Sequence, residues 1–111
     1  MITDDEIESA LTYLRDSARP AAVARAQAKS LEKYLHVVEA QQKVQHTGDG
    51  QANNRSQDLA RSSGDYRMAI GAWEEAVRKD CEFTMLREAA SARIEAWRTM
   101  CSNARAEGRV A

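Results

Sequence analysis

The stretch DYRMAIGAWEEAVRKDCEFTMLREAASARIEAWRTMCSNARAE, residues 65–107, decides the fold. Its apolar side chains recur at the three- and four-residue spacing of an α-helix, and no proline interrupts it. They form two stripes, first Tyr66, Ile70, Trp73 and Val77, then Phe83, Leu86, Ala90, Ile94, Trp97 and Cys101. On one helix the second stripe is rotated by about 120° from the first. We expect one long helix over about 63–107 with a local irregularity near 79–82; a break there is the alternative.

The C-terminal half of this stretch carries a further apolar face of small residues and one methionine. Its members are Met85, Ala89, Ala92 and Ala96, and their size lets another helix approach closely. A helix that is apolar on two faces needs two neighbours. The sequence therefore predicts a homo-oligomer, with these four residues as candidates for its interface.

The chain before residue 65 indicates further helices. Thr3 and Glu6 have the spacing of a capping box, which predicts a helix over about 4–17. Pro20 is expected to stop this helix and to begin a second one over about 20–46. Residues 47–62 are rich in Gly, Asn and Ser, which predicts a mobile loop with at most a short helical turn.

These elements predict an all-α fold in a single helical domain over residues 1–111. A helical hairpin would pair the second helix with the long C-terminal helix, and the short N-terminal helix would fold across it. The total is three to four helices in an oligomeric bundle. Composition agrees with this, because 20 of the 111 residues are Ala, while five Gly and one Pro leave few turns for an all-β fold.

The charge and the cysteine content of the chain limit the compartment in which it can act and the partners that it can bind. The formal net charge of -1 argues against a generic polyanion binder. No apolar run approaches the ~20 residues needed to cross a bilayer, and the N-terminus is acidic where a signal peptide is basic. Cys81 and Cys101 lie too far apart on one helix to form a disulfide. We expect reduced thiols, a cytoplasmic location and no membrane partner.

No constellation of residues indicates catalysis, and we expect the protein not to be an enzyme. His36 and His46 are ten residues apart and belong to no zinc-binding pattern, so no metal site is predicted. A nucleophile beside an oriented base is not specified anywhere in the chain. The short sequence at 48–50 lacks the spaced glycines and the lysine of a phosphate loop, and no cofactor is expected.

Arginine and tryptophan supply the candidates for partner binding. A ridge along the C-terminal helix, the arginine ridge, consists of Arg87, Arg98, Arg105 and Arg109. It is interpreted as a solvated, ion-paired face, as a protein-binding surface, or as a track for a nucleic-acid backbone. Trp73 and Trp97 lie on apolar stripes, where they either pack in the core or anchor a partner.

The run at 86–99, together with 102–106 and 10–18, resembles small uncharacterised proteins encoded by tailed phages and prophages. The resemblance implies an accessory protein that acts in the host cytoplasm, near phage recombination or replication, with no catalytic residues to carry over. We therefore expect a non-enzymatic helical protein that binds another protein of phage or host. The alternative is a host-directed inhibitor, such as an anti-CRISPR or another counter-defence protein. The third hypothesis is nucleic-acid binding through the arginine ridge.

Overall fold

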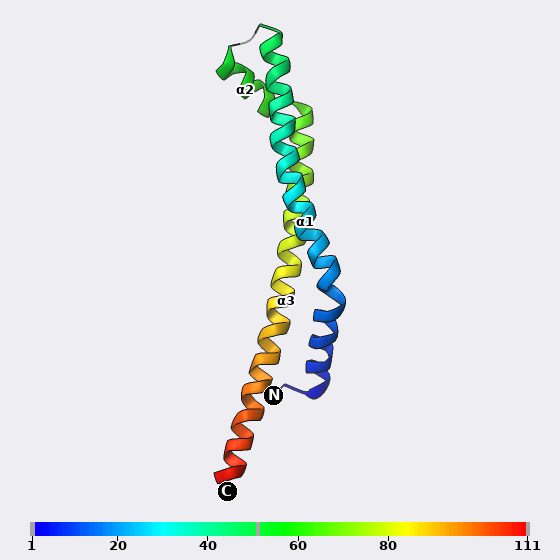
Figure 1. The fold of residues 1–111 in the computed structure, drawn as a ribbon, viewed down its shortest axis with the longest axis vertical. Coiled ribbons are helices and arrows are strands. Elements are labelled where there is room, and N and C mark those ends of the chain that lie inside the picture. Colours follow the sequence, from blue (N-terminus) through cyan, green and yellow to red (C-terminus); the bar gives the residue numbers. More distant parts are fainter. Residues whose placement is uncertain (1, 51, 111) are drawn as a thin grey trace. The chain divides into compact units, whose positions relative to one another are not determined.

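The part of the chain that the structure describes forms three α-helices. The computed structural model describes residues 2–50 and 52–110, with the side chains at 53, 54, 109 and 110 left out. The helices are α1 (Asp4–Gly48), α2 (Asn53–Ser62) and α3 (Gly64–Val110), and the described residues contain no strand (Figure 1). The predicted all-α class and the predicted long C-terminal helix are both confirmed.

The helices contribute to two compact units, where the sequence predicts a single domain. The first unit combines Met1–Ala22 with Cys81–Ala111, and the second unit is Val23–Asp80. Each unit therefore contains one part of α1 and one part of α3. Within each unit these parts run antiparallel, because residues late in the α1 part contact residues early in the α3 part.

The core of the first unit lies between its two helical segments. Its buried residues are Ile7 and Ala10 of α1 with Ala90 and Ile94 of α3. The partly buried residues that pack against this core are Ile2, Tyr13, Leu14 and Trp97. Two of the four buried residues are alanines, so the helices pack closely through small side chains rather than around a thick core.

The second unit has a core of the same kind between α1 and α3. Leu35 and Val38 of α1 and Ala69 of α3 are buried in it. Tyr66, Ile70 and Trp73 are partly buried against these residues. The first apolar stripe of α3 thus packs in the second unit, and the later stripe packs in the first unit.

The N-terminus of α1 carries the predicted capping box. The backbone N–H of Glu6 donates a hydrogen bond to Thr3 Oγ1 at 3.2 Å, and the backbone N–H of Thr3 donates one to Glu6 Oε2 at 3.3 Å. Two amide groups of the first turn, which have no partner within the helix, are satisfied in this way.

The predicted helix end before Pro20 is wrong, because α1 continues through it from Asp4 to Gly48. There is therefore no separate short N-terminal helix. Pro20 is exposed, so water can reach the carbonyl of Asp16 that a non-proline residue would engage. The turns on both sides bury residues of their own, Ser17 and Ala24, and this packing offsets the local cost of the proline.

The predicted loop at 47–62 is also largely wrong, because most of it forms α2. Ser56 and Ala60, one turn apart on α2, are completely buried. Thr47 Oγ1 donates a 3.0 Å hydrogen bond to Ser56 Oγ, which ties α2 to the end of α1 (Figure 1). Tertiary packing therefore stabilises a helix whose residues have weak helix propensity by themselves. Gly50 makes the turn before α2 with a positive φ of 93°.

The C-terminal helix is continuous through Cys81, as predicted, but the irregularity expected near 79–82 does not interrupt it. It begins after Ser63, whose hydroxyl accepts a 3.2 Å hydrogen bond from the backbone N–H of Tyr66 and donates one of 2.8 Å to the carbonyl of Ala60. Ser63 thus closes α2 and caps α3. The helix extends past Gly108 to Val110, slightly beyond the predicted end at about 107.

Candidate functional site

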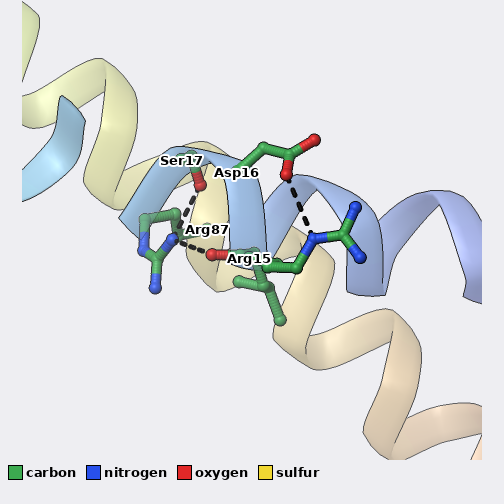
Figure 2. A network of polar contacts seen from close by, with 5 residues as sticks. Arg15, Asp16, Ser17 and Arg87 are labelled. Carbon is green, nitrogen blue, oxygen red and sulfur yellow. Dashed lines mark hydrogen bonds and ion pairs between the residues drawn. The ribbon is translucent and has the colours of Figure 1, made fainter. Parts of the chain in front are cut away.

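Arg87, the first member of the arginine ridge, belongs to the interior of the first unit. Its Nη1 atom donates hydrogen bonds of 2.7 Å to the carbonyl of Leu14 and 2.7 Å to Ser17 Oγ (Figure 2). Ser17 is only 5% exposed, and the guanidinium itself is half-buried. Sequence analysis missed this role, although Ser17 is a small polar residue close to an apolar helix stripe.

The two other described members of the ridge, Arg98 and Arg105, are exposed. Arg98 Nη1 pairs with Glu95 Oε1 at 2.9 Å, with both side chains exposed. Arg105 is exposed, and the side chain of Arg109 lies outside the described residues. Among the three arginines whose side chains the structure describes, Arg87 thus differs from the exposed Arg98 and Arg105, and the ion-paired interpretation fits Arg98 best.

The four small-residue candidates lie on an exposed face of α3, which we call the docking face: Met85, Ala89, Ala92 and Ala96. Met85 is 69% exposed, whereas Ile94 on another side of the same helix is 7% exposed. At 100° per residue, the docking face is centred about 150° from the buried residues of this segment, Ala90 and Ile94. Leu86, which sequence analysis places on the packed stripe, is 57% exposed and extends the apolar surface.

The two tryptophans are separated by the division into units. Trp97 packs against the first core, and Trp73 packs against the second. Both are half-buried rather than enclosed. Each therefore combines the core role with a partly open surface, and both of the predicted roles remain compatible with its position.

A polar network in the second unit joins α2 to α1. Glu39 Oε1 accepts hydrogen bonds from Arg61 Nε at 3.0 Å and from Gln57 Nε2 at 3.5 Å. The hydrogen bond from Arg61 is the main cause that holds the pKa of the Glu39 carboxyl below its ordinary value of 4.5. Glu39 is half-buried, and both of these hydrogen bonds come from α2.

A cavity of about 350 Å³ opens on the surface of the second unit, and we call it the aromatic cavity. Its lining combines apolar, aromatic and ionisable side chains: Glu32, Leu35, His36, Tyr66, Ile70, Trp73 and Glu74. The two carboxylates are exposed and come from different helices. Within the described part of the chain, neither Glu32 nor Glu74 makes a hydrogen bond or an ion pair.

The first unit also contains a buried hydroxyl group, that of Tyr13. Tyr13 packs against the core there, and its hydroxyl is buried without a hydrogen-bond partner among the described residues. A buried polar atom of this kind costs free energy unless a partner satisfies it. Tyr13 lines a small groove with Ala89 and Arg93.

The described residues contain no group of three or more His, Cys, Asp and Glu side chains that could hold a metal ion. His36 is exposed and His46 is half-buried. Cys81 and Cys101 are free thiols, the first exposed and the second half-buried. Among the described residues, no helix combines the length and apolar character that a membrane span requires.

The docking face in the first unit and the aromatic cavity in the second are the two candidate surfaces considered for function. Both have apolar side chains with exposed charged residues beside them. In comparisons with known proteins, the chain matches no protein-family model, no curated protein and no solved structure.

Proposed function

We propose that this protein is a non-catalytic helical interaction protein that acts by protein–protein binding through the docking face. The observation that carries the proposal is the exposure of Met85 and its neighbouring alanines on a helix whose other side already packs in the first unit. An exposed apolar surface on a small helical protein is typical of an association site.

The binding partner that best fits the docking face is a second copy of the chain. Its residues are spaced by four, three and four positions, which is the spacing of a coiled-coil seam. Alanines at such a seam allow two helices to approach closely. Glu88 and Arg93 flank the seam on opposite sides, so in a parallel pair Glu88 of one copy would face Arg93 of the other. This charge complementarity supports self-association.

The test is the oligomeric state of the purified protein by sedimentation equilibrium. Wild type is expected to dimerise, and Ala92→Glu is expected to weaken dimerisation at least about tenfold, because it buries a charge in the seam. Ala104→Glu makes the same chemical change at an exposed position of α3 away from the docking face. A monomeric wild type at high micromolar concentration, or equal effects of the two variants, would contradict the proposal.

The resemblance to phage accessory proteins suggests a further protein partner in the host cytoplasm, and the free thiols of Cys81 and Cys101 are compatible with that compartment. Affinity capture with wild type and Ala92→Glu as paired baits tests this. Recovery of phage recombination or replication proteins by wild type alone supports an accessory role. Recovery of a host defence complex supports counter-defence, including an anti-CRISPR role.

Direct binding of nucleic acid is the weaker hypothesis. Arg87 is engaged inside the first unit and Arg98 is paired with Glu95, so two of the three ridge arginines with described side chains already have partners. We expect no retention of single- or double-stranded DNA at about 50 mM salt, where electrostatic binding is strong.

A further inference from the structure

The aromatic cavity brings together an apolar floor and negative charge. Leu35 is buried beneath it, and Tyr66, Ile70 and Trp73 are half-buried, with parts of their surface open to the cavity. Its volume of about 350 Å³ lies at the lower end of the range for small-molecule sites. A cavity of this size accepts one side chain rather than a cofactor.

The carboxylates at the cavity differ from two other acidic residues of the second unit, Glu39 and Asp80. Glu39 is neutralised by Arg61, and Asp80 is paired with Arg25. Glu32 and Glu74 have no such partner among the described residues, although they line the same cavity from α1 and α3. Two unpaired carboxylates beside aromatic rings favour a cation as the ligand.

Arginine matches this combination better than lysine. Its guanidinium is planar, is weakly hydrated, stacks on aromatic faces and donates several hydrogen bonds to carboxylates at once. Lysine presents a compact, strongly hydrated charge that keeps more of its water. A peptide chain also supplies apolar atoms for the surface of Ile70 and Tyr66.

We propose that the aromatic cavity is a binding site for an arginine side chain of a protein partner, with Trp73 as the stacking surface and Glu32 and Glu74 as the hydrogen-bond acceptors. The site belongs to the second unit and does not depend on the docking face. Loss of dimerisation in the Ala92→Glu variant therefore leaves this binding intact, and the two proposals can fail separately.

The test uses the full chain and the peptide acetyl-Gly-Arg-Gly-amide as the probe. The corresponding citrulline peptide has nearly the same shape without the charge. With ¹⁵N-labelled protein, the indole N–H signals of Trp73 and Trp97 are followed during titration. We expect a saturable shift of the Trp73 signal with the arginine peptide, a much smaller one with citrulline, and an unchanged Trp97 signal.

The double variant Glu32→Gln/Glu74→Gln is expected to weaken binding of the arginine peptide about tenfold, through the loss of two exposed charge contacts. The variant Glu8→Gln/Glu107→Gln changes the net charge equally at exposed positions of the first unit and serves as the matched control. Circular dichroism verifies that both variants remain helical.

Three results would overturn the proposal. The first is a Trp73 signal that does not move, or that moves equally with citrulline. The second is an equal loss of affinity in the two double variants, which would mean that only net charge matters. The third is altered self-association in Glu32→Gln/Glu74→Gln, which would assign the cavity to an arginine of a second copy.

Discussion

Arg87 of α3 donates a 2.7 Å hydrogen bond to the buried hydroxyl of Ser17 on α1. The same guanidinium nitrogen donates a hydrogen bond to the carbonyl of Leu14, so one side chain links two helical segments of the first unit. Arg87, the first member of the arginine ridge, therefore has a structural role.

Replacement of Arg87 by Ala is expected to lower the free energy of unfolding by about 1–3 kcal/mol. Removal of the guanidinium leaves the buried Ser17 hydroxyl without its donor, and hydrogen bonds to charged groups are the stronger ones. Arg98→Ala removes only an exposed ion pair, and its effect should stay within about 0.5 kcal/mol. Urea denaturation followed by circular dichroism measures both variants, and equal effects would contradict the structural role of Arg87.

Ile94 and Leu86 belong to one apolar stripe in the sequence but differ in burial. Ile94→Ala is expected to cost about 2–5 kcal/mol, because a 7% exposed side chain would leave a cavity in the core. Leu86 is 57% exposed, so Leu86→Ala should cost less than about 1 kcal/mol. Denaturation curves with an unchanged slope check this difference. Equal losses at the two positions would show that the packed side of α3 is assigned incorrectly.

The unsatisfied hydroxyl of Tyr13 provides a prediction in the opposite direction. Tyr13→Phe keeps the ring in the first core and removes a buried oxygen that has no partner among the described residues. We expect unchanged stability or a gain of up to about 1 kcal/mol. Thermal unfolding of the variant beside wild type measures it. A loss of more than about 1 kcal/mol would mean that the hydroxyl has a partner in solution.

The capping box predicts a local effect at the start of α1. Thr3→Ala is expected to cost about 1 kcal/mol, because the N–H of Glu6 loses its acceptor. Thr3→Ser keeps the hydroxyl and should retain most of the stability. Amide hydrogen exchange at Glu6 and Ile7 reports the fraying directly. Equal exchange in Thr3→Ala and wild type would show that the box contributes nothing.

The ion pair between Glu39 and Arg61 predicts a dependence on pH. The pKa of Glu39 is held below 4.5 in the folded protein, mainly by the hydrogen bond from Arg61. Since the folded value lies below the unfolded one, the stabilisation is complete above the unfolded pKa and is lost as pH falls through the folded pKa. We expect Arg61→Met to destabilise the protein near neutral pH and to approach wild type in strong acid.

The matched control for this pair is Arg67→Met, which removes an exposed arginine from α3 of the same unit. Its effect on the free energy of unfolding should be small at every pH. Unfolding curves from neutral to acidic pH measure the wild-type-minus-variant difference. A difference for Arg61→Met that stays constant below pH 4.5 would mean that Glu39 does not titrate through this contact.

The helical class, the capping box at Thr3 and the unbroken C-terminal helix could all be read from the sequence. Each is a local property, set by residue spacing and by side chains that bond to their own helix turn. The exposure of Met85 and the alanines after it also follows the local pattern. These residues lie on a side of α3 that the packed stripe does not share.

Only the tertiary structure decided that α1 continues through Pro20, that residues 53–62 form a helix, and that Arg87 has a structural role. A proline signal was overridden because the turns on both sides of it bury Ser17 and Ala24. The weak helix α2 exists because Ser56 and Ala60 are buried and Glu39 accepts bonds from its side chains. In each case the deciding contact joins residues distant in sequence, and local spacing carries no information about such contacts.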